Sequence, residues 1–243
     1  MTRLLPFVFA LLLSLGLAGG ALAREEIRNY ITDIRVNADA SLDVTETITV
    51  NAEGYDIRRG IYRDIQLGTT DGNGSWEANR FVLTKVLHNG QPSPYVTEWN
   101  GRFLRVYIGD ADVFIPSGQH TYTINYITTR QLRSFAHYDE LYWNVTGNFW
   151  GFPIMSAVAR VQLPAGARAG QLAAYTGAFG EARGDFTAIG AGESEVRFDL
   201  TKPLGPEQGM TISVRFTKGV VKPVVGSTKL LGSGDSNTWE ILK

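Results

Sequence analysis

The feature that most constrains this chain is a strict alternation of apolar and polar residues over residues 42–50, interrupted only by Glu46 on the apolar side. A period of two residues places alternate side chains on opposite faces of a β-strand. Residues 30–36 alternate in the same way, and the intervening segment 37–41 is rich in residues that favour turns. The two runs are therefore predicted to form an antiparallel hairpin.

Further β-rich runs follow along the rest of the chain, separated by turn residues such as the Asn100–Gly101 pair. No long amphipathic helix is evident. The fold is predicted to be all-β, an antiparallel β-sandwich of immunoglobulin-like or related type in a single large domain. A division into two domains near Pro153–Ile154 is the alternative. The expected runs are 81–87, 95–99, 103–108, 120–129, 157–163, 172–176, 196–200 and 210–216.

Composition excludes several classes of function. The 243 residues carry 23 Lys plus Arg and 24 Asp plus Glu, so there is no basic excess of the kind that drives nucleic-acid binding. Cysteine is absent, which excludes disulfides, thiolate catalysis and cysteine-based metal centres. A hydrophobic content of 44% is enough to build a core, so the chain is not expected to be disordered.

The first 23 residues have the pattern of a secretory signal peptide. Arg3 lies in a short positive segment, residues 4–17 are mostly apolar, and an Ala-x-Ala site ends at Ala23. Cleavage after Ala23 is expected, and an uncleaved anchor helix is the alternative. We therefore expect an exported protein, periplasmic or on the extracytoplasmic face of the cytoplasmic membrane. Its folded domain is predicted to span residues 24–217, and residues 218–243 are predicted to be a disordered linker or aberrant tail.

Glu46 is expected to be a buried charge. It falls on the apolar face of its strand, where an unpaired carboxylate would be costly. The following loop contains three arginines, and Arg63 lies between apolar neighbours at Ile61 and Ile65. We predict a Glu46–Arg63 ion pair that holds this loop against the sheet. The alternative is a solvated Glu46 at a sheet edge.

Residues 138–153 are unusually rich in aromatic side chains that alternate with acidic and amide side chains. Aromatic contact area combined with directional hydrogen bonds is typical of sites that bind sugars or peptides. The alternative is that the aromatic residues fill the core and the asparagines stabilise turns. The candidate interaction surface consists of Tyr138, Asp139, Glu140, Tyr142, Asn144, Asn148 and Trp150.

Three segments carry a family resemblance. Residues 41–48, 59–65 and 138–147, followed by Trp150 and Phe152–Pro153, resemble the extracytoplasmic part of domain of unknown function 2207, a family of predicted bacterial membrane proteins. The resemblance covers roughly residues 25–217. It implies a signal peptide, an outward-facing β-rich domain, transmembrane helices and a cytoplasmic tail, and it implies no known reaction.

The chain departs from this family pattern after Lys218, where the expected membrane helices are missing. We expect a truncated or frame-shifted gene, and a free periplasmic form is the alternative. Membrane association is expected for the full-length family.

Patterns that carry catalysis or bind metals were not found in the sequence. The histidines form no His-Glu-x-x-His or His-x-His pair, and Asp110 and Asp112 lack the rest of a calcium loop. Asp139 and Glu140 are adjacent, so in a strand they point to opposite faces and cannot act as a carboxylate pair. No catalytic residue, metal ligand or cofactor is therefore assigned.

Two functions from different classes follow. The first is a binding or interaction module of the bacterial envelope, whose partner is an unknown envelope protein or glycan and not a nucleic acid. The second is a hydrolase acting on envelope glycan or peptide, with Asp139 and Glu140 near the aromatic residues. A cleft with two carboxylates and aromatic walls favours the enzyme. A shallow surface with buried aromatic side chains favours the module, and a simple spacer is a third possibility.

Overall fold

The structure is a computed structural model that describes residues 24–70, 76–78, 80–100 and 103–222. Within these ranges every helix or strand that occurs is a β-strand, so the all-β prediction is confirmed. No helix long and apolar enough to cross a bilayer is found in this part of the chain. The predicted signal peptide, residues 1–23, lies outside the described residues.

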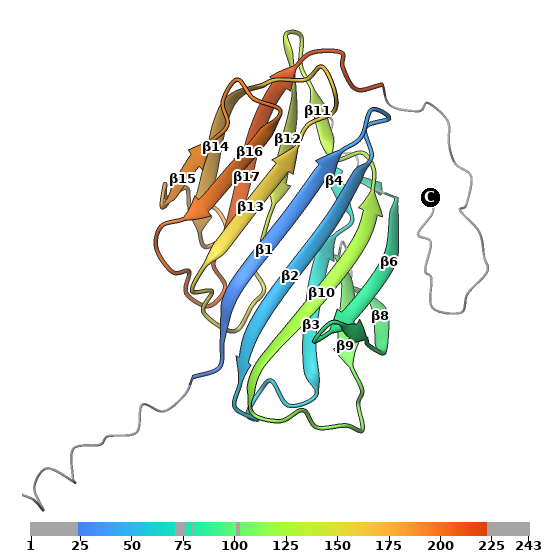
Figure 1. The fold of residues 1–243 in the computed structure, drawn as a ribbon, viewed down its shortest axis with the longest axis vertical. Coiled ribbons are helices and arrows are strands. Elements are labelled where there is room, and N and C mark those ends of the chain that lie inside the picture. The colour runs from blue at the N-terminus through green and yellow to red at the C-terminus, as the bar shows by residue number, and fades with distance from the viewer. Residues whose placement is uncertain (1–23, 71–75, 79, 101–102, 223–243) are drawn as a thin grey trace, which may run out of the picture.

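The first layer is an eight-stranded sheet that forms the front of the molecule in Figure 1. It runs from a short edge strand through the long central strands β1, β2 and β10 to a short hairpin at the other edge. Its spatial order is β15 (Phe186–Ile189), β16 (Glu195–Leu200), β13 (Ala157–Gln162), β1 (Glu26–Val36), β2 (Leu42–Ala52), β10 (Gly118–Thr128), β6 (Phe81–His88) and β7 (Gln91–Pro92).

The second layer lies behind the first and is divided into separate sheets (Figure 1). A four-stranded sheet has the order β11 (Leu132–Ser134), β12 (Tyr138–Asn144), β17 (Gly209–Thr217) and β14 (Ala169–Gly177). A three-stranded sheet has the order β3 (Gly60–Gln66), β9 (Phe103–Gly109) and β8 (Tyr95–Asn100). A further two-stranded ribbon joins β4 (Gly68–Thr70) and β5 (Trp76–Ala78).

The predicted hairpin forms as β1 and β2. The two strands are antiparallel, and Thr32 lies opposite Glu46 in their register. The burial of β2 alternates from Leu42 to Val50, because its even-numbered side chains face the second layer. Glu46 therefore faces the core, as the alternation predicted.

One pairing corrects the predicted antiparallel arrangement. β13 pairs with β1 in parallel, with Tyr30 opposite Ala157 and Ile34 opposite Val161. Parallel neighbours require a long crossover connection, and here the chain between β1 and β13 includes all the strands from β2 to β12, the last two of which belong to the second layer. The large sheet is therefore mixed. The sequence did not predict this, because the alternation of apolar and polar residues indicates which face a residue occupies and not the direction of its strand.

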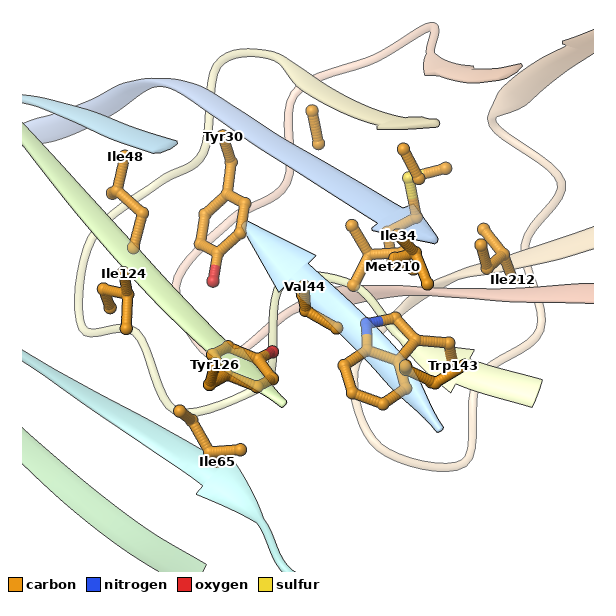
Figure 2. Close-up of a cluster of buried hydrophobic side chains, with 14 of the residues drawn as sticks. Tyr30, Ile34, Val44, Ile48, Ile65, Ile124, Tyr126, Trp143, Met210 and Ile212 are labelled. Atoms are coloured by element: carbon orange, nitrogen blue, oxygen red, sulfur yellow. The ribbon is translucent and has the colours of Figure 1, made fainter. Parts of the chain in front are cut away.

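The core lies between the two layers. Figure 2 shows Tyr30 and Val44 from the large sheet among the same buried side chains as Trp143 and Met210 from the four-stranded sheet and Ile65 from the three-stranded sheet. The buried apolar side chains of the described residues form one continuous cluster. Both halves of the second layer are therefore packed against the same face of the large sheet.

Two segments named by the sequence predictions are held by specific contacts. Ile154, at the alternative domain boundary, is fully buried and bridges to Ile27 and Leu204. Residues 218–222, which the predictions placed in the tail, also contact the fold, because the Lys222 amide donates to Ala38. The remainder of the predicted tail, residues 223–243, lies outside the described residues.

Candidate functional site

A buried carboxylate joins the two layers at their centre. Glu46 on β2 is completely inaccessible to solvent and accepts four hydrogen bonds. Arg63 on β3 donates two of them, from Nε to Oε2 at 2.8 Å and from Nη2 to Oε1 at 2.9 Å. The hydroxyls of Tyr30 on β1 and Tyr126 on β10 donate the others, at 2.7 and 2.8 Å. The structure thus brings Glu46 and Arg63 together, with two tyrosines that the sequence analysis did not assign.

The donors around Glu46 are fixed in their protonated forms. Burial raises the pKa of the Tyr30 and Tyr126 hydroxyls well above the usual range, and the Glu46 carboxylate raises both further. Burial alone would lower the pKa of Arg63, but the adjacent Glu46 charge outweighs it and the pKa is raised. The two tyrosine hydroxyls and the Arg63 guanidinium therefore remain hydrogen-bond donors at neutral pH.

Asp64 forms a second ion pair beside the first. Its two carboxylate oxygens each accept a hydrogen bond of 2.7 Å from Arg105 on β9. The Arg105 guanidinium lies over the Tyr62 ring, 4.3 Å from its centroid. The hydrogen bonds to Asp64 are the main cause of a raised pKa for Arg105. Asp64 is therefore occupied by a bidentate partner and is not a free acid.

A pocket of about 650 Å³ opens between the two halves of the second layer. Arg63 and Tyr126 of the buried cluster reach its lining, so the ion pair lies at its inner end. Phe103 and Phe149 form an edge-to-face pair at its wall, with ring centroids 4.8 Å apart. The aromatic residues of the lining are Phe103, Tyr126, Phe135, Tyr142, Trp143 and Phe149, and the amide residues are Gln66, Gln131 and Asn144.

The pocket does not have the arrangement expected of a glycosidase. Among its described lining residues the one carboxylate is Asp64, which is paired with Arg105. A glycosidase needs two carboxyl groups on either side of the scissile bond. In the described part of the chain, no three His, Asp or Glu residues are grouped to hold a metal ion. The geometry offers aromatic surfaces and hydrogen-bonding groups for binding.

The candidate interaction surface predicted from the sequence is divided by the structure. Tyr142 and Asn144 line the pocket, and Tyr142 is 37% exposed. Trp150 is instead a core residue, which corrects its assignment to a surface. Its Nε1 donates to the Thr146 carbonyl at 2.7 Å, and its ring packs edge-on against Tyr30. The turn after β12 therefore folds this indole inward.

Asp139 and Glu140 are also buried and lie on opposite faces of β12, so they do not belong to an open surface. Asp139 accepts bonds from Lys218 Nζ at 2.8 Å and from the Gly219 amide at 2.9 Å. Burial would raise the pKa of Asp139, but the bonds from Lys218 and neighbouring donors lower it overall. Glu140 accepts from the Ser213 hydroxyl at 2.7 Å. Both acids thus have structural partners.

The last two predicted surface residues lie beside the pocket. Tyr138 is half-buried beneath the Arg215 guanidinium, which is 4.5 Å from its ring centroid. Asn148 accepts a bond from the Asn144 side chain at 3.1 Å and donates to the Gly177 carbonyl. These contacts fix the turn that follows β12, so Asn148 supports the pocket wall and is not part of the described lining.

Two further polar arrangements were not predicted from the sequence. His88 on β6 and His120 on β10 are in hydrogen-bond contact, with Nε2 and Nδ1 2.8 Å apart. Glu25 accepts backbone hydrogen bonds from the amides of the loop 53–57. Each joins segments about 30 residues apart, and no local spacing in the sequence signals such contacts.

The chain is similar to known proteins in both sequence and fold. Uncharacterized protein YciQ of Escherichia coli (strain K12) is 29% identical over 130 residues, which are 54% of this chain and 21% of YciQ. Yeast LTA4 hydrolase in complex with bestatin matches 84% of this chain and 32% of its own, with a TM-score of 0.51 and 10% identity. An M1 zinc metallopeptidase mutant from Deinococcus radiodurans matches 77% of this chain and 42% of its own, with a TM-score of 0.44 and 16% identity.

The chain spans about a fifth of YciQ and about a third of the yeast hydrolase. At 10% identity, the likeness to the hydrolase concerns the fold alone. The family described as predicted membrane protein (DUF2207), N-terminal domain, matches residues 26–216, nearly all of the described chain. The chain therefore belongs to the DUF2207 family of predicted membrane proteins.

Proposed function

We propose that this domain is a binding module of the bacterial envelope, whose partner is an envelope protein or glycan held in the pocket between β3 and β12. The pocket itself carries the proposal. It combines solvent-exposed aromatic rings with amide and guanidinium groups, and its described carboxylate is already paired. Clefts of several hundred Å³ with aromatic walls and a few polar groups are typical of ligand sites.

The aromatic walls of the pocket supply exposed contact area. Phe149 is 49% exposed and Tyr142 is 37% exposed, although both lie beside a well-filled core. The Arg133 guanidinium lies over the Tyr142 ring, 3.9 Å from its centroid. Arginine and tyrosine are among the residue types enriched where proteins bind partners. These exposed rings therefore support a binding role for the pocket.

We also propose that the domain is exported and works on the outer side of the cytoplasmic membrane. The leader pattern in residues 1–23 and the membrane-protein family support this location. Expression in a bacterial host followed by mass spectrometry of the periplasmic fraction should give a chain that begins at Arg24. Retention of the leader in the cytoplasm would contradict the proposal. The immunoglobulin-like character of the sandwich remains a prediction.

Binding is tested by nuclear magnetic resonance. Muramidase-solubilised peptidoglycan fragments and a pool of random peptides are added separately to the labelled protein. We expect at least one of these probes to shift resonances of the pocket lining, and Phe149→Ala to weaken the response. Phe114→Ala is the matched control, because Phe114 is 61% exposed and is not among the lining residues. Absence of shifts with both probes, or equal effects of the two variants, would refute the proposal.

A further inference from the structure

Strand β12 has one edge that is only partly paired. β17 pairs with it along Tyr138–Asn144, whereas β11 pairs only with Asp139–Leu141. From Tyr142 to Asn144, no described strand is hydrogen-bonded to this edge. A strand edge without a neighbour presents unpaired N–H and C=O groups, which are a template for another chain.

The hydrogen bonds at either end of β12 show which backbone groups face the open edge. The Tyr138 carbonyl accepts a backbone bond of 3.0 Å on the β11 side. The Val145 amide donates to β17 at 2.8 Å. Since alternate residues of an antiparallel strand bond to alternate edges, the backbone groups of Tyr142 and Asn144 face away from β17.

Strand β3 presents a second open edge to the same pocket. It is the outer strand of its sheet and pairs with β9 alone among the described strands. The Asp64 carbonyl accepts a bond of 2.6 Å from its neighbour Arg63 Nη1, so this carbonyl points away from β9. The side chain of Arg63 thus satisfies an acceptor that a neighbouring strand would otherwise satisfy.

Both edges belong to the lining of one pocket, which includes residues 63–66 of β3 and residues 142–144 of β12. The pocket continues the line of β11, whose three residues Leu132–Ser134 also belong to its lining. A chain entering here would extend the four-stranded sheet where β11 stops. Its alternate side chains would face the aromatic residues of the pocket or the outer face that carries Arg133.

The charge of the lining favours an acidic ligand. Its described residues include three arginines, Arg63, Arg130 and Arg133, and one aspartate. Arg63 and Asp64 are each neutralised by a partner outside the lining, Glu46 and Arg105 respectively. The exposed charged side chains of the lining are therefore those of Arg130 and Arg133. Arg133 lies 3.6 Å from Glu140. Its side chain is also half-exposed, so a ligand carboxylate can approach the same guanidinium.

We infer that the ligand is an extended acidic peptide segment of a partner protein, which adds as a strand to the open edge of β12. This inference rests on the proposed binding function and specifies its ligand. Main-chain hydrogen bonds supply affinity in this mode of recognition, and pockets for alternate side chains supply specificity. A glycan lacks the regular row of amide donors and carbonyl acceptors that the edge would match.

The test begins with a phage-displayed library of random 12-residue peptides selected on the mature protein. In the enriched sequences, acidic residues should alternate with apolar residues. A synthetic copy is then made with N-methyl groups on alternate amides, in both registers. Because N-methylation removes donors and keeps side chains, one register should bind about tenfold more weakly than the unmodified peptide, and the other should be less affected.

The matching change in the protein is Tyr142→Pro, with Tyr142→Ala as its control. Proline removes an amide that faces the open edge and is not part of the pairing with β17. We expect the Tyr142→Pro variant to bind the peptide about tenfold more weakly than the Tyr142→Ala variant, which loses the same ring. If the proline variant does not fold, the N-methylated peptides decide the question alone.

The outcomes separate this inference from the proposed function. Failure to enrich any peptide, or equal binding of the unmodified and both N-methylated peptides, overturns strand addition. If peptidoglycan fragments shift the pocket resonances while peptides do not, the binding function stands and the peptide ligand is rejected. If neither probe acts on the pocket, both proposals fall.

Discussion

Replacing Arg63 by methionine tests the attachment of the three-stranded sheet to the large sheet. Glu46 would lose two of its four hydrogen bonds and its balancing charge, in a site with no access to water. Removal of one partner from a buried ion pair costs about 3–5 kcal/mol. The two tyrosine hydroxyls remain as donors, so we expect a loss near the lower limit, about 3 kcal/mol. For a domain of this size that corresponds to a fall in Tm of roughly 6–12 °C.

The assay is urea unfolding of the mature chain followed by tryptophan fluorescence. Arg160→Met is the matched control, because Arg160 and Asp33 form an ion pair in which both side chains are nearly half-exposed. It should cost less than about 1 kcal/mol. The double variant with Glu46→Gln and Arg63→Met should be more stable than Arg63→Met alone, since no uncompensated charge remains. Equal free energies of unfolding for Arg63→Met and Arg160→Met would refute the reasoning.

Three further predictions use other contacts. Gly147→Ala should destabilise by about 1–3 kcal/mol in urea unfolding, because φ is +76° and a Cβ would lie 2.5 Å from Arg63 Nη1. Glu25→Gln should accelerate hydrogen exchange of the 53–57 amides, which donate to that carboxylate, and unchanged exchange would contradict this role. The pKa of His88 is lowered, mainly by burial and further by the neighbouring His120. Because the folded state then binds this proton less readily than the unfolded state, stability should be lost as pH falls below about 6.5, and His88→Gln should flatten that dependence of Tm on pH.

The sequence predicted those parts of the fold that depend on local periodicity. Alternation in residues 30–36 and 42–50 identified both strands of the first hairpin and placed Glu46 on the inner face. The apolar neighbours of Arg63 likewise indicated that its side chain turns inward. These features follow from the two-residue period of a strand, which can be read without knowing its neighbours.

Features that depend on distant pairing were not predictable in this way. Tyr126 lies 80 residues from Glu46, and only the antiparallel pairing of β10 with β2 brings them together. The parallel pairing of β1 and β13 leaves no mark in the alternation of either strand. Aromatic residues near asparagines occur both in binding sites and in cores, so the sequence pattern did not fix the position of Trp150. The turn that brings its indole back to the Thr146 carbonyl places it in the core.

The divided second layer explains why charges are buried at the centre of this domain. Apolar packing is not directional, so it does not by itself fix the position of a three-stranded sheet next to a four-stranded one. The bonds from Arg63 to Glu46 do so, because a guanidinium and a carboxylate meet in one planar geometry. Arg63 also lines the pocket, so we expect a shift of β3 to change the opening between β3 and β12. Loss of this ion pair should therefore impair ligand binding in molecules that remain folded.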